Sequence, residues 1–115
     1  MIPTESRLLR IYVDAHDRWQ GRPLYEAIVA RARAADVAGA SVFPVEMSFG
    51  SHHRIHDAAS DYGFMDLPVV IELVDGPERV DALLAELGPM IKGAVVTVES
   101  VRVVRYAHAE RETKP

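Results

Sequence analysis

The spacing of the apolar residues changes along this chain, from every second residue to every third or fourth and back again. Leu9, Ile11 and Val13 alternate with other residues over 8–14. This alternation predicts a strand, because successive side chains of a strand point to opposite faces. The polar stretch 14–21 then indicates a connecting loop. The two spacings, and the order in which they occur, restrict the chain to few folds.

The segment 21–39 predicts a helix, because its apolar residues recur every three or four positions. Pro23 fits the first helical turn, where a backbone N–H would have no partner. Gly39 is expected to end the helix. The apolar stripe consists of Leu24, Ile28, Ala32 and Ala35.

Two strands are expected next, at 40–50 and 67–75, joined by a polar, histidine-rich connection at 51–66. Pro44 cannot donate a hydrogen bond to a neighbouring strand, so it marks a sheet edge or a bulge. The connection is longer than the usual length of about four to six residues, and long connections in compact domains are most often functional or mobile.

A second helix is expected after the strand at 67–75. Asp75 and Glu78 form the D-x-x-E pattern of a capping box, in which the two side chains would bond backbone N–H groups at the helix start. Gly88 and Pro89 end this helix, and a β-branched strand follows at 94–106. The apolar stripe of the helix consists of Val80, Leu83, Leu84 and Leu87.

The resulting order, βαββαβ, predicts an α+β, ferredoxin-like fold, with a four-stranded antiparallel sheet and two helices on one face. The length of 115 residues suits a single domain, 1–115. Its folded core is expected to span about 7–106, followed by a polar tail at 107–115 that we expect to fray.

Two helices can cover only one face of such a sheet, yet the strands 67–75 and 94–106 are apolar on both faces. An exposed apolar patch of this kind marks an interface, so we expect the uncovered face to be buried by self-association. The uncovered side would carry Val70 and Val74, together with either Val96, Val98 and Val104 or Val95, Val101 and Val103.

Three charged residues, Arg10, Glu72 and Arg102, would interrupt this apolar surface. Charges that leave water are stable only when they are paired, so we expect opposite charges there to form ion pairs. Arg102 is expected to pair with Glu72 or Glu99 if it binds no ligand.

Composition excludes several classes of protein. A net charge of −4 argues against an electrostatic nucleic-acid binder, and without cysteine the chain has no disulfide or thiolate site. No apolar run approaches the roughly 18 residues of a membrane span, and the first residues do not resemble a signal peptide. We therefore expect a cytoplasmic protein without direct membrane insertion.

Three stretches of the sequence, GRPLYEAIV, FGSHHRIH and DLPVVIE, resemble a PII-like bacterial and archaeal family still classed as a domain of unknown function. The resemblance covers about residues 7–106. It implies a ferredoxin-like fold and, through similarity to PII signalling proteins and the CutA group, a homotrimer whose sheets pack inward. It also implies that 51–66 is the effector loop, which docks onto a protein target such as a membrane transporter.

The same resemblance implies a nucleotide site in the clefts between subunits. Such a cleft combines the base of the effector loop, the turn before the last strand and basic residues near the end of that strand. The matching positions are Phe49, Gly50, Lys92, Gly93, Arg102 and Arg105.

This sequence departs from the PII pattern in the spacing of its arginines. Arg102 and Arg105 lie three residues apart, which places them on opposite faces of a regular strand. Arg54 could add a planar, phosphate-binding group to the cleft.

The histidines of SHHRIH support a second hypothesis. His52 and His56 would share a face if this piece were helical, and with His53 they could hold a metal ion, as a CutA-like protein would. Nearby carboxylates follow no recognised ligand spacing. His56, next to Ile55, is the histidine with the strongest case for a structural or ligand role.

The sequence as a whole predicts a PII-like signalling protein that binds a small anionic effector, an adenine nucleotide, between subunits. A CutA-like metal-binding protein is the alternative. No sequence pattern of a nucleophile elbow, an HExxH site or a phosphate-binding P-loop occurs, so we do not expect an enzyme.

Overall fold

The structure is a computed structural model that describes residues 2–45, 47–48, 56–57 and 68–104. Within these ranges it contains eight strands, two α-helices and one 3₁₀ turn. In chain order they are β1 (Glu5–Asp14), β2 (Arg18–Trp19), β3 (Arg22–Pro23), α1 (Leu24–Ala34), β4 (Ala40–Pro44), β5 (Met47–Ser48), β6 (His56–Asp57), β7 (Pro68–Asp75), α2 (Pro77–Leu87), the 3₁₀ turn Gly88–Met90 and β8 (Val95–Arg102).

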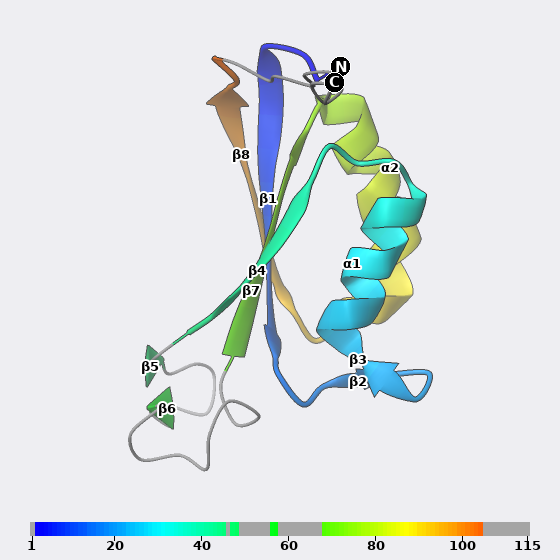
Figure 1. Ribbon diagram of the computed structural model, residues 1–115, viewed down its shortest axis with the longest axis vertical. Coiled ribbons are helices and arrows are strands. Elements are labelled where there is room, and N and C mark those ends of the chain that lie inside the picture. Colours follow the sequence, from blue (N-terminus) through cyan, green and yellow to red (C-terminus); the bar gives the residue numbers. More distant parts are fainter. Residues whose placement is uncertain (1, 46, 49–55, 58–67, 105–115) are drawn as a thin grey trace, which may run out of the picture.

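The main sheet has the strand order β4-β7-β1-β8, with every neighbouring pair antiparallel. The helices α1 and α2 lie side by side on one face of this sheet, and no described helix lies on the other face (Figure 1). This arrangement confirms the predicted ferredoxin-like α+β fold. Neither described helix is long and apolar enough to cross a membrane.

The core lies between the sheet and the two helices, and alternation along the strands determines which side chains enter it. Leu9 and Ile11 of β1 are fully buried, as are Val69 and Ile71 of β7. Both predicted helix stripes contribute to the core, as the apolar periodicity indicates. From the helices, the buried residues are Leu24, Ala27, Ile28, Ala32, Val80, Leu83 and Leu87.

Pro44 lies in an edge strand, as its missing N–H predicts. The N–H of Val45 donates to the carbonyl of Pro68 at 3.0 Å. Hydrogen-bonded pairs alternate along an antiparallel ladder, so Phe43 and Ser41 also bond β7, whereas the backbone groups of 40, 42 and 44 point outward. Proline therefore occupies a position where no N–H is needed.

The segment predicted as a loop at 14–21 instead contains most of a small hairpin formed by β2 and β3, which the sequence did not indicate. Trp19 of β2 pairs with Arg22 of β3 around Gln20 and Gly21, whose φ angles are +49° and +83°. Two successive positive φ angles define the turn whose twist suits a two-residue hairpin, and glycine tolerates the second without strain. Pro23 consequently precedes α1 as its N-cap rather than lying inside its first turn.

The helix α1 ends at Ala34, well before Gly39, which was the expected stop. The chain reverses at Asp36, whose φ is +62°. Aspartate tolerates this left-handed conformation better than most residues. Arg79 of α2 also donates to the carbonyl of Asp36 at 2.7 Å, so the residue at which the chain reverses has a partner on the second helix.

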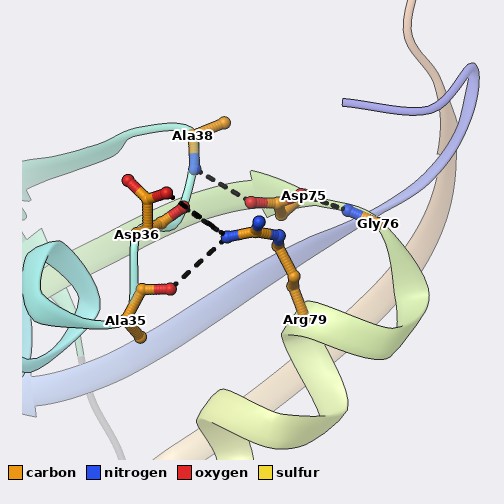
Figure 2. Close-up of polar contacts among 6 residues, drawn as sticks. All are labelled: Ala35, Asp36, Ala38, Asp75, Gly76 and Arg79. Atoms are coloured by element: carbon orange, nitrogen blue, oxygen red, sulfur yellow. Dashed lines mark hydrogen bonds and ion pairs between the residues drawn. The ribbon is translucent and has the colours of Figure 1, made fainter. Parts of the chain in front are cut away.

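The capping box predicted at Asp75 and Glu78 is wrong. Gly76 is the N-cap of α2, no side chain bonds the cap, and Pro77 occupies the first helical position. Proline there already removes one free N–H. The carboxylate of Asp75 instead accepts from the N–H groups of Gly76 and Ala38, at 2.7 and 2.9 Å (Figure 2).

The strands predicted at 40–50 and 94–106 are shorter in the structure. β4 leaves the main sheet after Pro44, and β5 pairs with β6 in a separate two-stranded sheet. The second helix ends at Leu87, as Gly88 predicts. β8 spans Val95–Arg102, and the predicted tail at 107–115 lies outside the described residues.

The corrected role of Asp75 generates a prediction about stability. Asp75→Ala should lower the free energy of unfolding by about 1–3 kcal/mol, because it leaves two N–H groups of a buried junction without their acceptor. Glu78→Ala, a change of an exposed carboxylate three residues later, should change it by less than about 0.5 kcal/mol. Urea denaturation of both variants tests this. If Glu78→Ala lowered the free energy of unfolding more than Asp75→Ala does, the capping box would be supported after all.

Candidate functional site

The face of the sheet opposite the helices carries a line of apolar side chains across all four strands. In the register of the sheet, Phe43 lies opposite Val70, Val70 lies opposite Tyr12, and Tyr12 lies opposite Val95. Paired residues of antiparallel strands project from the same face. Phe43, Tyr12 and Val95 are 48%, 37% and 62% exposed. We call these four residues the apolar row.

The register also decides between the two valine sets predicted for this face. Leu8 and Tyr12 of β1 project away from the helices, and they pair with Glu99 and Val95. The uncovered side therefore holds Val95 and Val101. Val96 turns toward the helices and packs against the core.

Arg10 lies at the centre of the open face and bridges two carboxylates. Its Nε donates to Glu72 Oε2 at 2.9 Å, and its Nη1 donates to Glu99 Oε1 at 2.7 Å. The hydrogen bond to Glu72, followed by that to Glu99, raises the pKa of Arg10 above its already high ordinary value. The guanidinium thus stays charged, and the pair of Arg10 with Glu72 agrees with the expectation that opposite charges on this face form ion pairs. The contribution of Glu99 was not anticipated.

Arg102 does not belong to this group of charges. It lies opposite Glu5 in the β1–β8 register, on the side of the sheet that the helices cover, and its own side chain is exposed. The expected pairing with Glu72 or Glu99 within the chain is therefore wrong. Alternation along β8 explains this, because Glu99 and Arg102 are three residues apart.

Lys92 and Gly93 lie in the exposed turn before β8, whereas Arg102 ends that strand. At about 3.3 Å per residue, the two ends of this eight-residue strand are about 23 Å apart. One chain therefore does not bring Lys92 and Arg102 together around a single small ligand.

Several predicted site residues lie outside the part of the chain that the structure describes: Phe49, Gly50, Arg54 and Arg105, together with His52 and His53. The backbone of His56 belongs to the strand β6. Among the described residues, no group of three potential ligands could hold a metal ion.

A hollow of about 370 Å³, which the sequence analysis missed, lies on the open face where β7 ends and β4 begins. Its volume is within the range of small-molecule sites, roughly 300–1,000 Å³. Among the described residues that line it, Glu72 carries the only charge, and Ser41 adds a hydroxyl. The rest of the lining is residues 38–40, Val74, Ile2 and Val103.

Most of this lining is backbone or small apolar side chains, which carry no chemical signal in a sequence. The run of small residues 38–41 around Gly39 was the one available indication. A Cβ added at Gly39 would meet no atom within 4 Å, so the space beside it is open to a ligand.

The bridge made by Arg10 generates a prediction about salt. In the wild type, salt screens the attraction between Arg10 and its two carboxylates, so added sodium chloride should lower this contribution to stability. In Arg10→Gln, Glu72 and Glu99 are left to repel each other, and added salt should raise the urea midpoint. Arg33→Gln makes the same charge change on the exposed surface of α1 and controls for net charge. If salt changed the urea midpoint of both variants equally, the ion pairs of Arg10 with Glu72 and Glu99 would not contribute to stability.

Comparison with known proteins agrees with this fold. A UPF0166 protein of Aquifex aeolicus is 29% identical over 100 residues, which cover 87% of this chain and 94% of that protein. The structure of CPII, a nitrogen regulatory PII-like protein from Thiomonas intermedia K12 bound to ADP, AMP and bicarbonate, has a TM-score of 0.68 at 20% identity and covers 88% of this chain and 90% of that chain.

CutA from Synechococcus elongatus also has a similar structure, with a TM-score of 0.60 at 16% identity over 89% of this chain and 81% of that chain. These likenesses establish a PII-like, ferredoxin-like fold. Residues 6–103 match the DUF190 family, described as an uncharacterized ACR family. This match spans most of the sequence and agrees with the resemblance seen in GRPLYEAIV and DLPVVIE. The chain therefore belongs to the DUF190 family.

Proposed function

We propose that this chain is a cytoplasmic, PII-like regulatory protein that forms a homotrimer and binds an adenine nucleotide between subunits. Segment 51–66 then engages a protein target, so that the protein acts by binding rather than by catalysis. The observation that carries this proposal is the fold shared with CPII, whose structure contains ADP and AMP, over 88% of the chain.

The apolar row supports self-association. Exposed aromatic and β-branched side chains on consecutive strands form a surface that is costly to leave in water, at about 25 cal/mol per Å² of apolar area. The charges beside the row are already paired, since Arg10 bonds both Glu72 and Glu99. Paired charges can be buried at a smaller cost than isolated ones.

The position of the hollow supports a site between subunits. It opens on the same face as the apolar row, so a neighbouring copy packed on that face would close it. Of the lining residues that the structure describes, only Glu72 is charged, and its carboxylate would repel a phosphate. The base of a nucleotide therefore fits the hollow better than its phosphates do.

The phosphates would then require cations from elsewhere in the assembly. Lys92 and Arg102, the described basic residues of the expected cleft, are too far apart to act together within one chain. A second copy can supply one of them to the site of the first. Gly93 beside Lys92 is exposed and has open space around it, which suits a close approach by a ligand.

Self-association can be tested by substituting Tyr12, at the centre of the apolar row. Tyr12→Glu should yield a monomer, because an unpaired carboxylate would have to be buried in the interface. Light scattering should give three times the mass of one chain for the wild type. Ala82→Glu, on the exposed surface of α2, should leave that mass unchanged. A stable, folded wild-type monomer at micromolar concentration would refute the proposed assembly.

Nucleotide binding can be tested at Lys92, which lies in the exposed turn before β8 and outside the sheet. A charge-assisted contact to phosphate contributes about 1.5–3 kcal/mol, so Lys92→Ala should weaken binding about ten- to a hundredfold. Calorimetry with ATP, ADP and AMP measures this, and Arg33→Ala, on the exposed surface of α1, controls for lost charge.

Two results would overturn nucleotide binding: a wild type that binds none of the three nucleotides, or Lys92→Ala binding as tightly as the wild type. If that same wild type bound Zn²⁺, and His52→Ala with His53→Ala abolished the binding, the CutA-like alternative would replace it.

A further inference from the structure

One wall of the hollow is formed by residues 38–40, which are the end of the connection between α1 and β4 and the first residue of β4. Within the described part of the chain, the N–H of Gly39 has no hydrogen-bond partner, and the backbone groups of Ala40 point outward from the edge of the sheet. The wall therefore offers backbone donors and acceptors at the rim of the hollow. A loop can recognise a ligand with such groups only if its backbone is held in one position.

Asp75 holds this wall. Asp75 is buried, at only 4% exposed, and it does not itself line the hollow. Oδ2 accepts from the N–H of Ala38 at 2.9 Å, and Oδ1 accepts from the N–H of Gly76 at 2.7 Å (Figure 2). One carboxylate thus ties the connection before β4 to the end of β7 and the start of α2.

Arg79, in the first turn of α2, makes a second contact with the same connection. Its Nη1 donates to the carbonyl of Asp36 at 2.7 Å and approaches the carbonyl of Ala35 at 3.5 Å (Figure 2). The carboxylate of Asp36 lies 3.9 Å from the same nitrogen. Arg79 of α2 therefore fixes Asp36, which has a left-handed backbone conformation, and this sets the direction in which the chain continues to residues 38–40.

We propose that Asp75 is a positioning residue of the nucleotide site, supported by Arg79, and that it fixes residues 38–40 so that their backbone recognises the edge of the base. This inference rests on the proposed nucleotide binding. It adds a reason for selectivity: adenine presents an amino donor where a 6-oxo purine presents an acceptor. A rigid backbone wall, with Glu72 as the neighbouring acceptor, can match the first pattern and not the second.

The test compares ADP with IDP, the corresponding 6-oxo diphosphate, by calorimetry on the intact assembly. The wild type should prefer ADP. Asp75→Asn keeps the shape of the side chain but replaces one acceptor by a donor facing an N–H group. It should weaken ADP binding about tenfold and reduce the ADP-to-IDP preference, because the wall then samples several positions.

Hydrogen exchange provides a second readout. In Asp75→Asn the amide of Ala38 should exchange faster, while that of Ile71 in the core should not change. Asp81→Asn makes the same chemical change on the exposed surface of α2 and should match the wild type in every measurement. A purely structural loss would lower the fraction of folded protein without altering the preference between ADP and IDP.

Arg79→Ala keeps the inference testable if Asp75→Asn does not fold. This exposed side chain should tolerate removal. The variant should lose ADP affinity and ADP-to-IDP preference in the same direction as Asp75→Asn, by about a third as much. The inference is overturned if folded variants at both positions keep the wild-type affinity and preference. A wild type that binds neither nucleotide refutes the proposed function instead, so the two failures are distinguishable.

Discussion

The structure depends on the mismatch between a four-stranded sheet and the two helices available to cover it. Leu9, Ile11, Val69 and Ile71 are sealed under α1 and α2, and this single layer of contacts forms the core. The same strands necessarily present their alternate residues to the other side. The sequence decides whether that other side is polar or apolar. In this protein it carries the apolar row, which crosses all four strands. In the proposed function, burial of this row connects the fold to self-association, and self-association to the nucleotide site.

The polar groups of the open face are arranged consistently with such burial. Arg10 neutralises Glu72 and leaves Glu99, on β8, as a second partner. One guanidinium with two carboxylates has a surplus negative charge, which favours a ligand that places an uncharged base, rather than a phosphate, next to Glu72. The hollow, the ion-pair bridge and the apolar row thus occupy adjacent parts of one surface.

The faces of β1 and β7 could be predicted because alternation is a property of each strand alone. The choice between the valine sets of β8 could not, since it depends on how β8 pairs with β1. Asp75 was misread because D-x-x-E is compatible with a cap at Asp75, whereas Gly76 and Pro77 move the helix start by one residue. The carboxylate of Asp75 and the wall at 38–40 come from separate parts of the chain, and only the folded structure brings them together.

Burial of the open face in solution can be measured directly by hydroxyl-radical footprinting with mass spectrometry. If the face is buried, Tyr12 and Phe43 of the wild type are protected from oxidation, and both become reactive when the protein is unfolded in urea. In an isolated chain these residues are 37% and 48% exposed. Oxidation of the folded protein at the rates expected for that exposure would show that the face is open to water, and would contradict the account.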